Sequence, residues 1–146
     1  MKIEIQVDET RKEPLVVVYT DKVNEEVHAL VRRLSQDAAQ VLVGFREDEA
    51  TILQEDAILR VYAEGGKVLA ETMDEVYALR LRLYELEERL DRTRFVRISN
   101  SEIVNLRKVK GFDLSFAGTI CVRLQNNAET FVSRRYVAKI KQVLGL

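Results

Sequence analysis

The chain begins with a short alternation of polar and apolar residues. Residues 2–7 (KIEIQV) alternate with a period of two, and residues 15–19 (LVVVY) form a β-branched run, so both are predicted strands. Residues 20–34 then carry apolar side chains at helical spacing, with Thr20 or Asp21 as the candidate N-cap. The apolar positions of this predicted helix are Val23, Val27, Leu30, Val31 and Leu34. The pattern predicts a small β-hairpin followed by a helix.

The middle of the chain is typical of short strands separated by turns. Strand-like runs cover residues 41–45, 49–54 and 57–72, and the Gly65-Gly66 pair predicts a tight hairpin turn inside the last of them. Residues 74–90 then carry one apolar stripe at helical spacing and are predicted to form a helix.

The C-terminal part returns to strands. Residues 94–98 alternate as a strand, and residues 99–109 are predicted as a short helical turn. Further predicted strands cover residues 111–116, 118–125 and 129–133, and a helix over residues 134–144 ends the chain. We therefore predict a mainly-β or α+β fold of short antiparallel sheets with a few packed helices.

The charges are divided unevenly along the chain. The net charge is −1, but residues 1–91 hold 12 basic and 21 acidic side chains, a balance of −9, whereas residues 92–146 hold 11 and 3, a balance of +8. A basic segment of this kind indicates a polyanion-binding surface. The alternative is a protein-interaction module whose basic face binds an acidic partner, including the chain's own acidic part. An RNA reader is less favoured, because aromatic residues for base stacking are few.

Residues that catalysis and metal binding need are sparse. His28 is the single histidine and has no Cys or His neighbour, so we expect a structural role for it. Cys121 is the single cysteine, which excludes an internal disulfide and indicates an inert thiol in a reducing compartment. No phosphate-binding or dinucleotide motif and no apolar run of membrane-spanning length is present. We expect a cytoplasmic protein that is not an enzyme and uses no metal, cofactor or small-molecule substrate.

One polar turn is not explained by folding alone. The stretch RFVRISNSEIVNL (94–106) gathers Arg97, Ser99, Asn100 and Ser101 where a predicted strand ends. Asparagine and arginine make bidentate contacts to adenine and guanine edges, so this turn is a candidate DNA contact.

A second basic turn precedes the last helix. Ser133 is a candidate N-cap, and Arg134 and Arg135 follow it. Two cations at a helix N-terminus cost a few tenths to about 1 kcal/mol against the helix dipole, whereas a docked phosphate would be stabilised there. Both basic turns therefore favour a DNA-reading surface.

These two stretches also resemble a known family. FVRISNSEIVNLRKVKGF and FVSRRYVAKIKQVL are similar, in content and spacing, to the LytTR DNA-binding domain of bacterial transcriptional regulators. EDAILRVYAEGGKVLAET and LRLYELEERL resemble the family's early strands and first helix, so the resemblance covers roughly residues 48–146. We accordingly expect two parts, a hairpin-helix element over residues 1–47 with a signal, dimer or packing role, and a LytTR-like domain over residues 48–146.

The resemblance implies a mode of DNA reading. The family places loops, not a recognition helix, in successive major grooves of duplex DNA. Its contact loops correspond here to Asn100 with Arg97 and Ser101 beside it, to Arg135 with Arg134 nearby, and to Lys67 in the early hairpin. Ser99 stands where family members often have histidine. Some members also carry a histidine in the early hairpin, where this chain has Gly65-Gly66-Lys67. Ser133, in the turn before the last helix, is the remaining candidate DNA-binding residue.

The resemblance also implies partners. We expect a homodimer, or two side-by-side copies, on a direct-repeat promoter site, and as a hypothesis a small membrane protein that restrains the regulator. Not every motif residue is expected to touch DNA. Asn105 is predicted to be a buried amide bonded to backbone, and Phe95, Val96 and Ile98 are predicted core.

Overall fold

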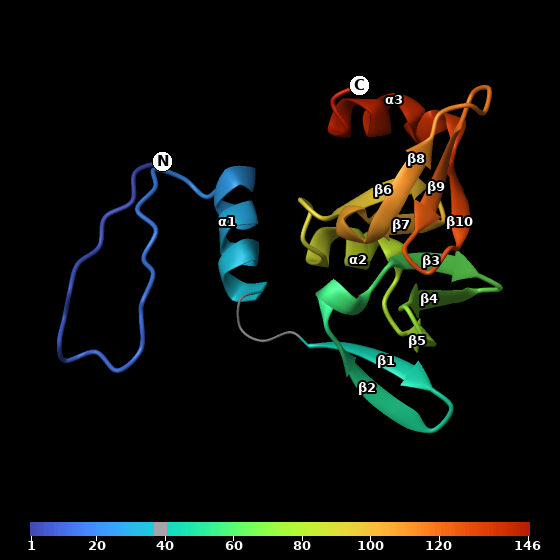
Figure 1. The fold of residues 1–146 in the computed structure, drawn as a ribbon. Helices are drawn as coiled ribbons and strands as arrows, with labels where there is room; N and C mark the ends of the chain where they lie inside the picture. The colour runs from blue at the N-terminus through green and yellow to red at the C-terminus, as the bar shows by residue number, and fades with distance from the viewer. Residues whose placement is uncertain (37–40) are drawn as a thin grey trace. The chain divides into compact units, whose positions relative to one another are not determined.

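The computed structural model describes residues 1–36 and 41–146 and divides the chain into two units, Met1–Ala38 and Ala39–Leu146. In the first unit, residues 1–24 fold back on themselves in an extended course, and α1 (Glu25–Gln36) follows (Figure 1). The predicted strands at residues 2–7 and 15–19 are wrong, because neither segment forms a hydrogen-bonded ladder. An isolated two-stranded hairpin is at best marginally stable in water, and no third element of the unit covers these residues.

The helix in this unit is confirmed, but its cap is not the one predicted. Asn24 caps α1, because its Oδ1 accepts a hydrogen bond from the backbone N of Val27 at 3.1 Å. The Thr20 hydroxyl instead donates to the carbonyl of Lys22.

The second unit contains two antiparallel sheets. The larger has seven strands in the order β2-β1-β5-β4-β3-β7-β6, and the smaller has three in the order β10-β9-β8. The strands of the large sheet are β1 (Leu42–Arg46), β2 (Glu49–Leu53), β3 (Arg60–Glu64), β4 (Lys67–Glu71), β5 (Val76–Leu79), β6 (Phe95–Ser99) and β7 (Glu102–Asn105). Those of the small sheet are β8 (Val109–Asp113), β9 (Ile120–Leu124) and β10 (Glu129–Val132), and the unit's helices are α2 (Leu83–Arg89) and α3 (Arg134–Val143). The predicted class of short antiparallel sheets with a few helices is confirmed.

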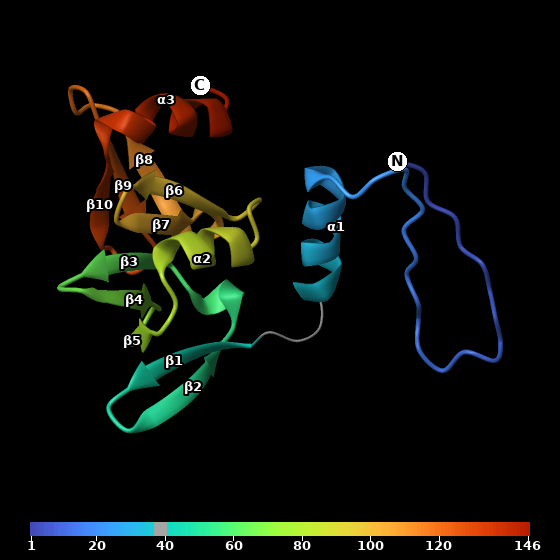
Figure 2. The same ribbon diagram turned by 180° about the vertical axis from the view of Figure 1, so that it is seen from behind.

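Strands β6 and β7 separate two hydrophobic cores. On one face, Phe95 and Ile103 pack in a cluster with Leu86 of α2. On the other face, Val96 and Val104 pack in a cluster with the small sheet and α3 (Figure 2). Successive side chains on a strand point to opposite faces, so one short strand can serve both cores. Phe95, Val96 and Ile98 are buried as predicted.

The predicted helix over residues 74–90 is only half correct. Residues 83–89 form α2, but Val76–Leu79 form β5, which pairs with β4 and, through Ala78, with Phe45 of β1. A run of four mostly apolar residues does not by itself distinguish a strand from a helix, and pairing with two neighbouring strands selects the strand.

The predicted helical turn over residues 99–109 is also largely wrong. Glu102–Asn105 form β7, which lies between β3 and β6, and only Leu106–Lys108 form a 3-10 turn. All four residues of β7 are buried, which is the environment of a central strand.

The predicted boundary after residue 47 divides a hairpin. β1 and β2 pair from Leu42↔Leu53 to Arg46↔Glu49, so β1 belongs to the second unit. The first unit therefore contains the extended segment and α1 without β1.

Candidate nucleic-acid interface

Three segments of the chain meet at one end of the strands of the large sheet: the β3–β4 turn, the β6–β7 turn and the start of α3. We call this end the interface edge. The β3–β4 turn and the β6–β7 turn are neighbours, because β3 pairs with β7 and the backbone N of Ala63 donates to the carbonyl of Ser101 at 2.8 Å. The start of α3 joins them, because the backbone N of Ser133 donates to the carbonyl of Ile98 at 2.9 Å. Residues more than 30 positions apart in the chain are thus fixed side by side.

The β3–β4 turn depends on its two glycines. Gly65 and Gly66 have φ of 58° and 77°, in the left-handed region that glycine adopts without steric cost. Such a two-residue turn matches the twist of the flanking strands, and Glu64 pairs with Lys67 across it. Lys67 is therefore the first strand residue after the turn, and its side chain is exposed.

Arg97 holds the β6–β7 turn in place. Its Nε donates to the carbonyl of Ser99 at 2.9 Å, and its Nη2 donates to the carbonyl of Asn100 at 2.5 Å. Its Nη1 donates to Glu87 Oε2 of α2 at 2.6 Å, and the side chain is 14 % exposed. A guanidinium with three partners, one of them a carboxylate, fixes the backbone of the turn against α2.

The side chain of Asn100 is also held. The Tyr136 hydroxyl of α3 donates to Asn100 Oδ1 at 3.3 Å. A hydrogen bond on the oxygen of the amide leaves both N–H donors of Nδ2 for another molecule. Asn100 is exposed, so its amide can donate to an acceptor on a base edge or a phosphate.

The start of α3 presents two exposed cations. Ser133 occupies the N-cap position of α3 with extended backbone, as predicted. Its side chain, however, makes no capping hydrogen bond. Arg134 and Arg135 follow in the first turn and are exposed. The open N–H groups of this turn and the two guanidinium groups all favour an anion.

A comparison with protein families identifies the fold. Residues 48–145 match the model of the LytTr DNA-binding domain. The chain belongs to the LytTR DNA-binding domain family. The resemblance predicted over residues 48–146 is confirmed, and with it the class of DNA-binding transcriptional regulator.

Relatives of about the same length align along the whole chain, the first unit included. An uncharacterised HTH-type transcriptional regulator of Staphylococcus aureus strain NCTC 8325 / PS 47 is 31% identical over 147 residues, which is 100% of this chain and 99% of that protein. A similarly named protein of strain MRSA252 is 30% identical over the same span. Both names describe a helix-turn-helix type of regulator, a motif in which two helices are joined by a short turn. In the part of this chain that the structure describes, the element after each of α1 and α2 is a strand.

A solved structure shares the LytTR fold. The LytTr DNA-binding domain of a protein described as a methyl-accepting/DNA response regulator from Bacillus cereus superposes with a TM-score of 0.71. It is 20% identical and covers 75% of this chain and all of its own. At that identity the likeness shows the fold alone.

The interface edge includes most of the predicted contact residues. Asn100, Ser101, Lys67, Arg134 and Arg135 are exposed there. The other three, Arg97, Ser99 and Ser133, are partly buried, and their hydrogen bonds shape the turns.

Tyr136 is the residue that sequence reasoning missed. Its position, three residues after Ser133 on a predicted helix, gave no sign that its hydroxyl reaches Asn100, 36 residues away in the chain. Asn105 is confirmed as a buried amide, because its Nδ2 donates to the carbonyl of Ile58 at 2.9 Å and its Oδ1 accepts from the backbone N of Arg107.

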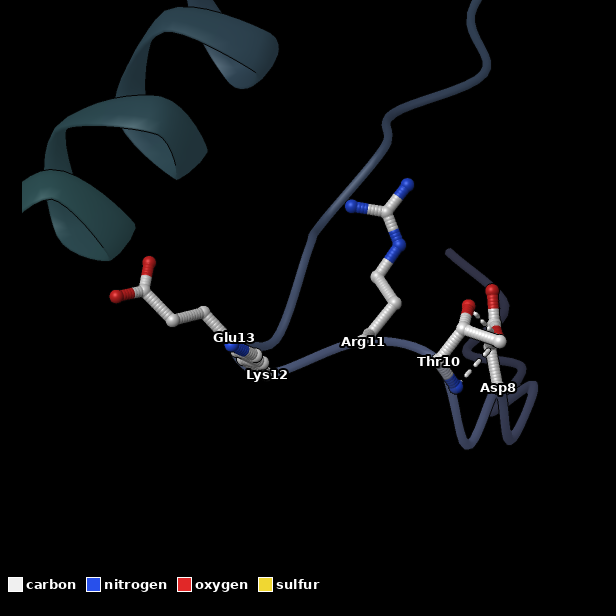
Figure 3. Close-up of a pocket in the computed structure, with 5 residues that line it drawn as sticks. All are labelled: Asp8, Thr10, Arg11, Lys12 and Glu13. Carbon is white, nitrogen blue, oxygen red and sulfur yellow. Dashed lines mark hydrogen bonds between the residues drawn. The ribbon is translucent and has the colours of Figure 1, made fainter.

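Other surfaces gather less chemistry. A concavity in the first unit is lined by Asp8, Thr10, Arg11, Lys12 and Glu13, which come from a single exposed stretch (Figure 3). Burial raises the pKa of the Cys121 thiol, as an inert cysteine requires. Within residues 1–36 and 41–146, no helix is long and apolar enough to cross a membrane.

Proposed function

We propose that this LytTR protein is a sequence-specific transcriptional regulator that reads successive major grooves of duplex DNA through the three turns of its interface edge. The observation that carries the proposal is the fixed position of Asn100. Arg97 holds its backbone and Tyr136 holds its amide oxygen, and the residue itself is exposed. A pre-positioned donor on an exposed turn is suited to reading a base edge.

The proposal gives each exposed residue a role. Asn100 and Arg135 contact bases, with guanine N7 and O6 as the acceptors that suit arginine. Arg134, Ser101 and Lys67 contact phosphates or flanking bases and set the register. Arg97, Ser99 and Ser133 position the turns, and the protein has no enzymatic activity.

The wider setting is part of the same proposal. The regulator acts in a bacterial cytoplasm as a homodimer, or as two adjacent copies, on a direct-repeat promoter site. A small membrane protein that restrains it is a further expected partner. The alternative, a basic face that binds an acidic protein, predicts no enriched DNA motif.

The test is a selection of duplex DNA from a random library by the purified protein, followed by titration of the selected site. Arg135→Ala and Asn100→Ala are each expected to lose about 1–3 kcal/mol on that site and to keep weak nonspecific binding. Arg107→Ala is the matched control, because Arg107 is exposed and lies beyond the opposite end of β7.

Salt dependence provides a second readout. Logarithmic affinity is expected to fall with logarithmic salt concentration by about 0.9 for each phosphate that the protein neutralises. A library that yields no enriched motif, or an Arg107→Ala variant as weak as Arg135→Ala, would contradict the proposal.

A further inference from the structure

The helix of the first unit has an apolar stripe that its own unit leaves open. Val31 is 48% and Leu34 is 41% exposed, and Val27 and Leu30, one turn before them, are half-buried. Residues 15–19, in the segment before the helix, are exposed as well. An apolar stripe that stays exposed on a folded protein indicates an interaction site.

The size of the first unit indicates that a partner completes it. Chains below about 40 residues bury too little surface to fold without disulfides, metals or oligomerisation. Unit Met1–Ala38 has no cysteine, so a disulfide is excluded. The Staphylococcus relatives align over this unit as well as over the second one.

The charges beside the stripe are complementary to a second copy of the same helix. Glu26 and Arg33 are seven residues apart, about two helical turns, and therefore lie on the same edge of the stripe. When two such helices pack antiparallel, the same edge of each faces the other. Glu26 of one copy then lies opposite Arg33 of its partner, and the twofold symmetry repeats the pair.

The other charged pair of α1 lies elsewhere. Glu25 and Arg32 are on the side of the helix away from the stripe, and Arg32 Nη2 lies 4.0 Å from Glu25 Oε2 of its own chain. These two charges satisfy each other within one helix. They are available as a control with the same residue types and the same spacing of seven residues.

We propose that α1 is a homodimerisation helix that packs antiparallel against α1 of a second copy of this chain. Val27, Leu30, Val31 and Leu34 form the apolar seam, and Glu26 pairs with Arg33 of the partner at its edge. In such a seam Val27 packs near Leu34 of the partner, and Leu30 lies near the twofold axis. This deepens the proposed function, because it names the surface that holds two DNA-reading edges together.

The test uses the full chain without DNA and measures its mass by light scattering after size exclusion. The wild type is expected to be a dimer. Glu26→Arg and Arg33→Glu each place like charges opposite each other twice in the dimer, and each is expected to weaken self-association about tenfold or more. An equimolar mixture of the two variants is expected to form a heterodimer, because both of its contacts between positions 26 and 33 would again join opposite charges.

The matched control is the double variant Glu25→Arg/Arg32→Glu. It changes the charges at the same ends of α1 but away from the seam, and it is expected to remain dimeric. Val31→Asp is a second probe, expected to give a monomer whose second unit is still folded by near-ultraviolet spectroscopy.

Several results would overturn the proposal. A wild-type chain that is monomeric at micromolar concentration would show that the stripe is covered by another protein or by the rest of the chain. Single charge variants that remain dimeric, or a mixture that does not associate, would exclude the antiparallel pairing. Because the measurement contains no DNA, a failure here leaves the DNA-binding test untouched.

Discussion

Arg97 and Asn100 are three residues apart in the chain, and their side chains do different things. Both belong to a turn rich in arginine and small polar residues, which suggested that all of them face DNA. The structure pairs Arg94 with Asp56 and Asp91, and Arg97 with Glu87, so two arginines of this stretch are already engaged in ion pairs. The arginines of this stretch therefore support the turn, and Asn100 and Ser101 are its exposed polar side chains.

Tyr136 offers a test at the scale of one atom. Tyr136→Phe removes the hydroxyl that donates to Asn100 Oδ1 and keeps the ring. The loss of one hydrogen bond is expected to cost about 0.5–1.5 kcal/mol on the selected DNA site and to relax base preference at the position that Asn100 reads. Nonspecific binding is expected to be unchanged, as titration with a scrambled duplex would measure.

Tyr84→Phe is the control for this change, because Tyr84 is an exposed tyrosine on α2. If Tyr136→Phe bound the site with wild-type affinity and preference, the amide of Asn100 would not depend on α3.

At the scale of elements, one glycine sets how closely β1 approaches β5. A Cβ on Gly44 would lie 2.7 Å from Leu53 Cδ1 and 2.7 Å from Tyr77 Cβ. These distances are shorter than carbon atoms tolerate, so the side chains of β2 and β5 occupy the space that any larger residue would need. The β1–β2 hairpin is thus packed into the sheet and is not a loose appendage.

Gly44→Ala is expected to lower the free energy of unfolding by about 1–3 kcal/mol, through overpacking. Urea denaturation followed by circular dichroism would measure it. Gly111→Ala is the matched control, because Gly111 also lies in a strand and an added Cβ there would meet nothing within 4 Å. Equal stability of the two variants would mean that β1 and β2 can move away from β5.

At the scale of the whole second unit, a buried polar network joins the two sheets. Arg60 of β3 pairs with Glu71 of β4 and Glu102 of β7. The small sheet reaches the same carboxylates, because the Thr130 hydroxyl donates to Glu102 at 2.8 Å and Asn126 Nδ2 donates to Glu71 at 3.1 Å. The network fixes the angle between the sheets and so supports the position of the β6–β7 turn.

Glu102 makes stability depend on pH. Burial raises the pKa of its carboxyl above the ordinary 4.5, against the opposing effects of the Thr130 hydroxyl and Arg60. The folded state then binds this proton more tightly than the unfolded state, so its contribution to stability falls as pH rises from below 4.5 through the raised pKa. Glu102→Gln removes the titrating group.

The difference in unfolding free energy between wild type and Glu102→Gln is therefore expected to shift against the wild type over that pH range. Urea titrations at several pH values would measure it. Glu64→Gln, which removes an exposed carboxylate from β3, controls for net charge. A wild type whose stability relative to Glu102→Gln did not change with pH would contradict the assignment.

Sequence alone determined the features that depend on near neighbours. Gly65-Gly66 predicted its turn because only glycine adopts two positive φ values without strain. Residues 134–144 predicted the last helix closely, since α3 spans Arg134–Val143. The position of Asn105 between two apolar residues predicted that its amide is buried. The two LytTR stretches predicted the family.

The tertiary structure decided what depends on distant partners. Val76–Leu79 became a strand because β4 and β1 flank it, and Glu102–Asn105 because β3 and β6 do. Arg97 became a support because Glu87 of α2 lies within reach. Hydrogen bonds and ion pairs act over a few ångströms in space and carry no period along the chain, so only the folded arrangement could reveal that Tyr136, Arg97 and Asn100 meet.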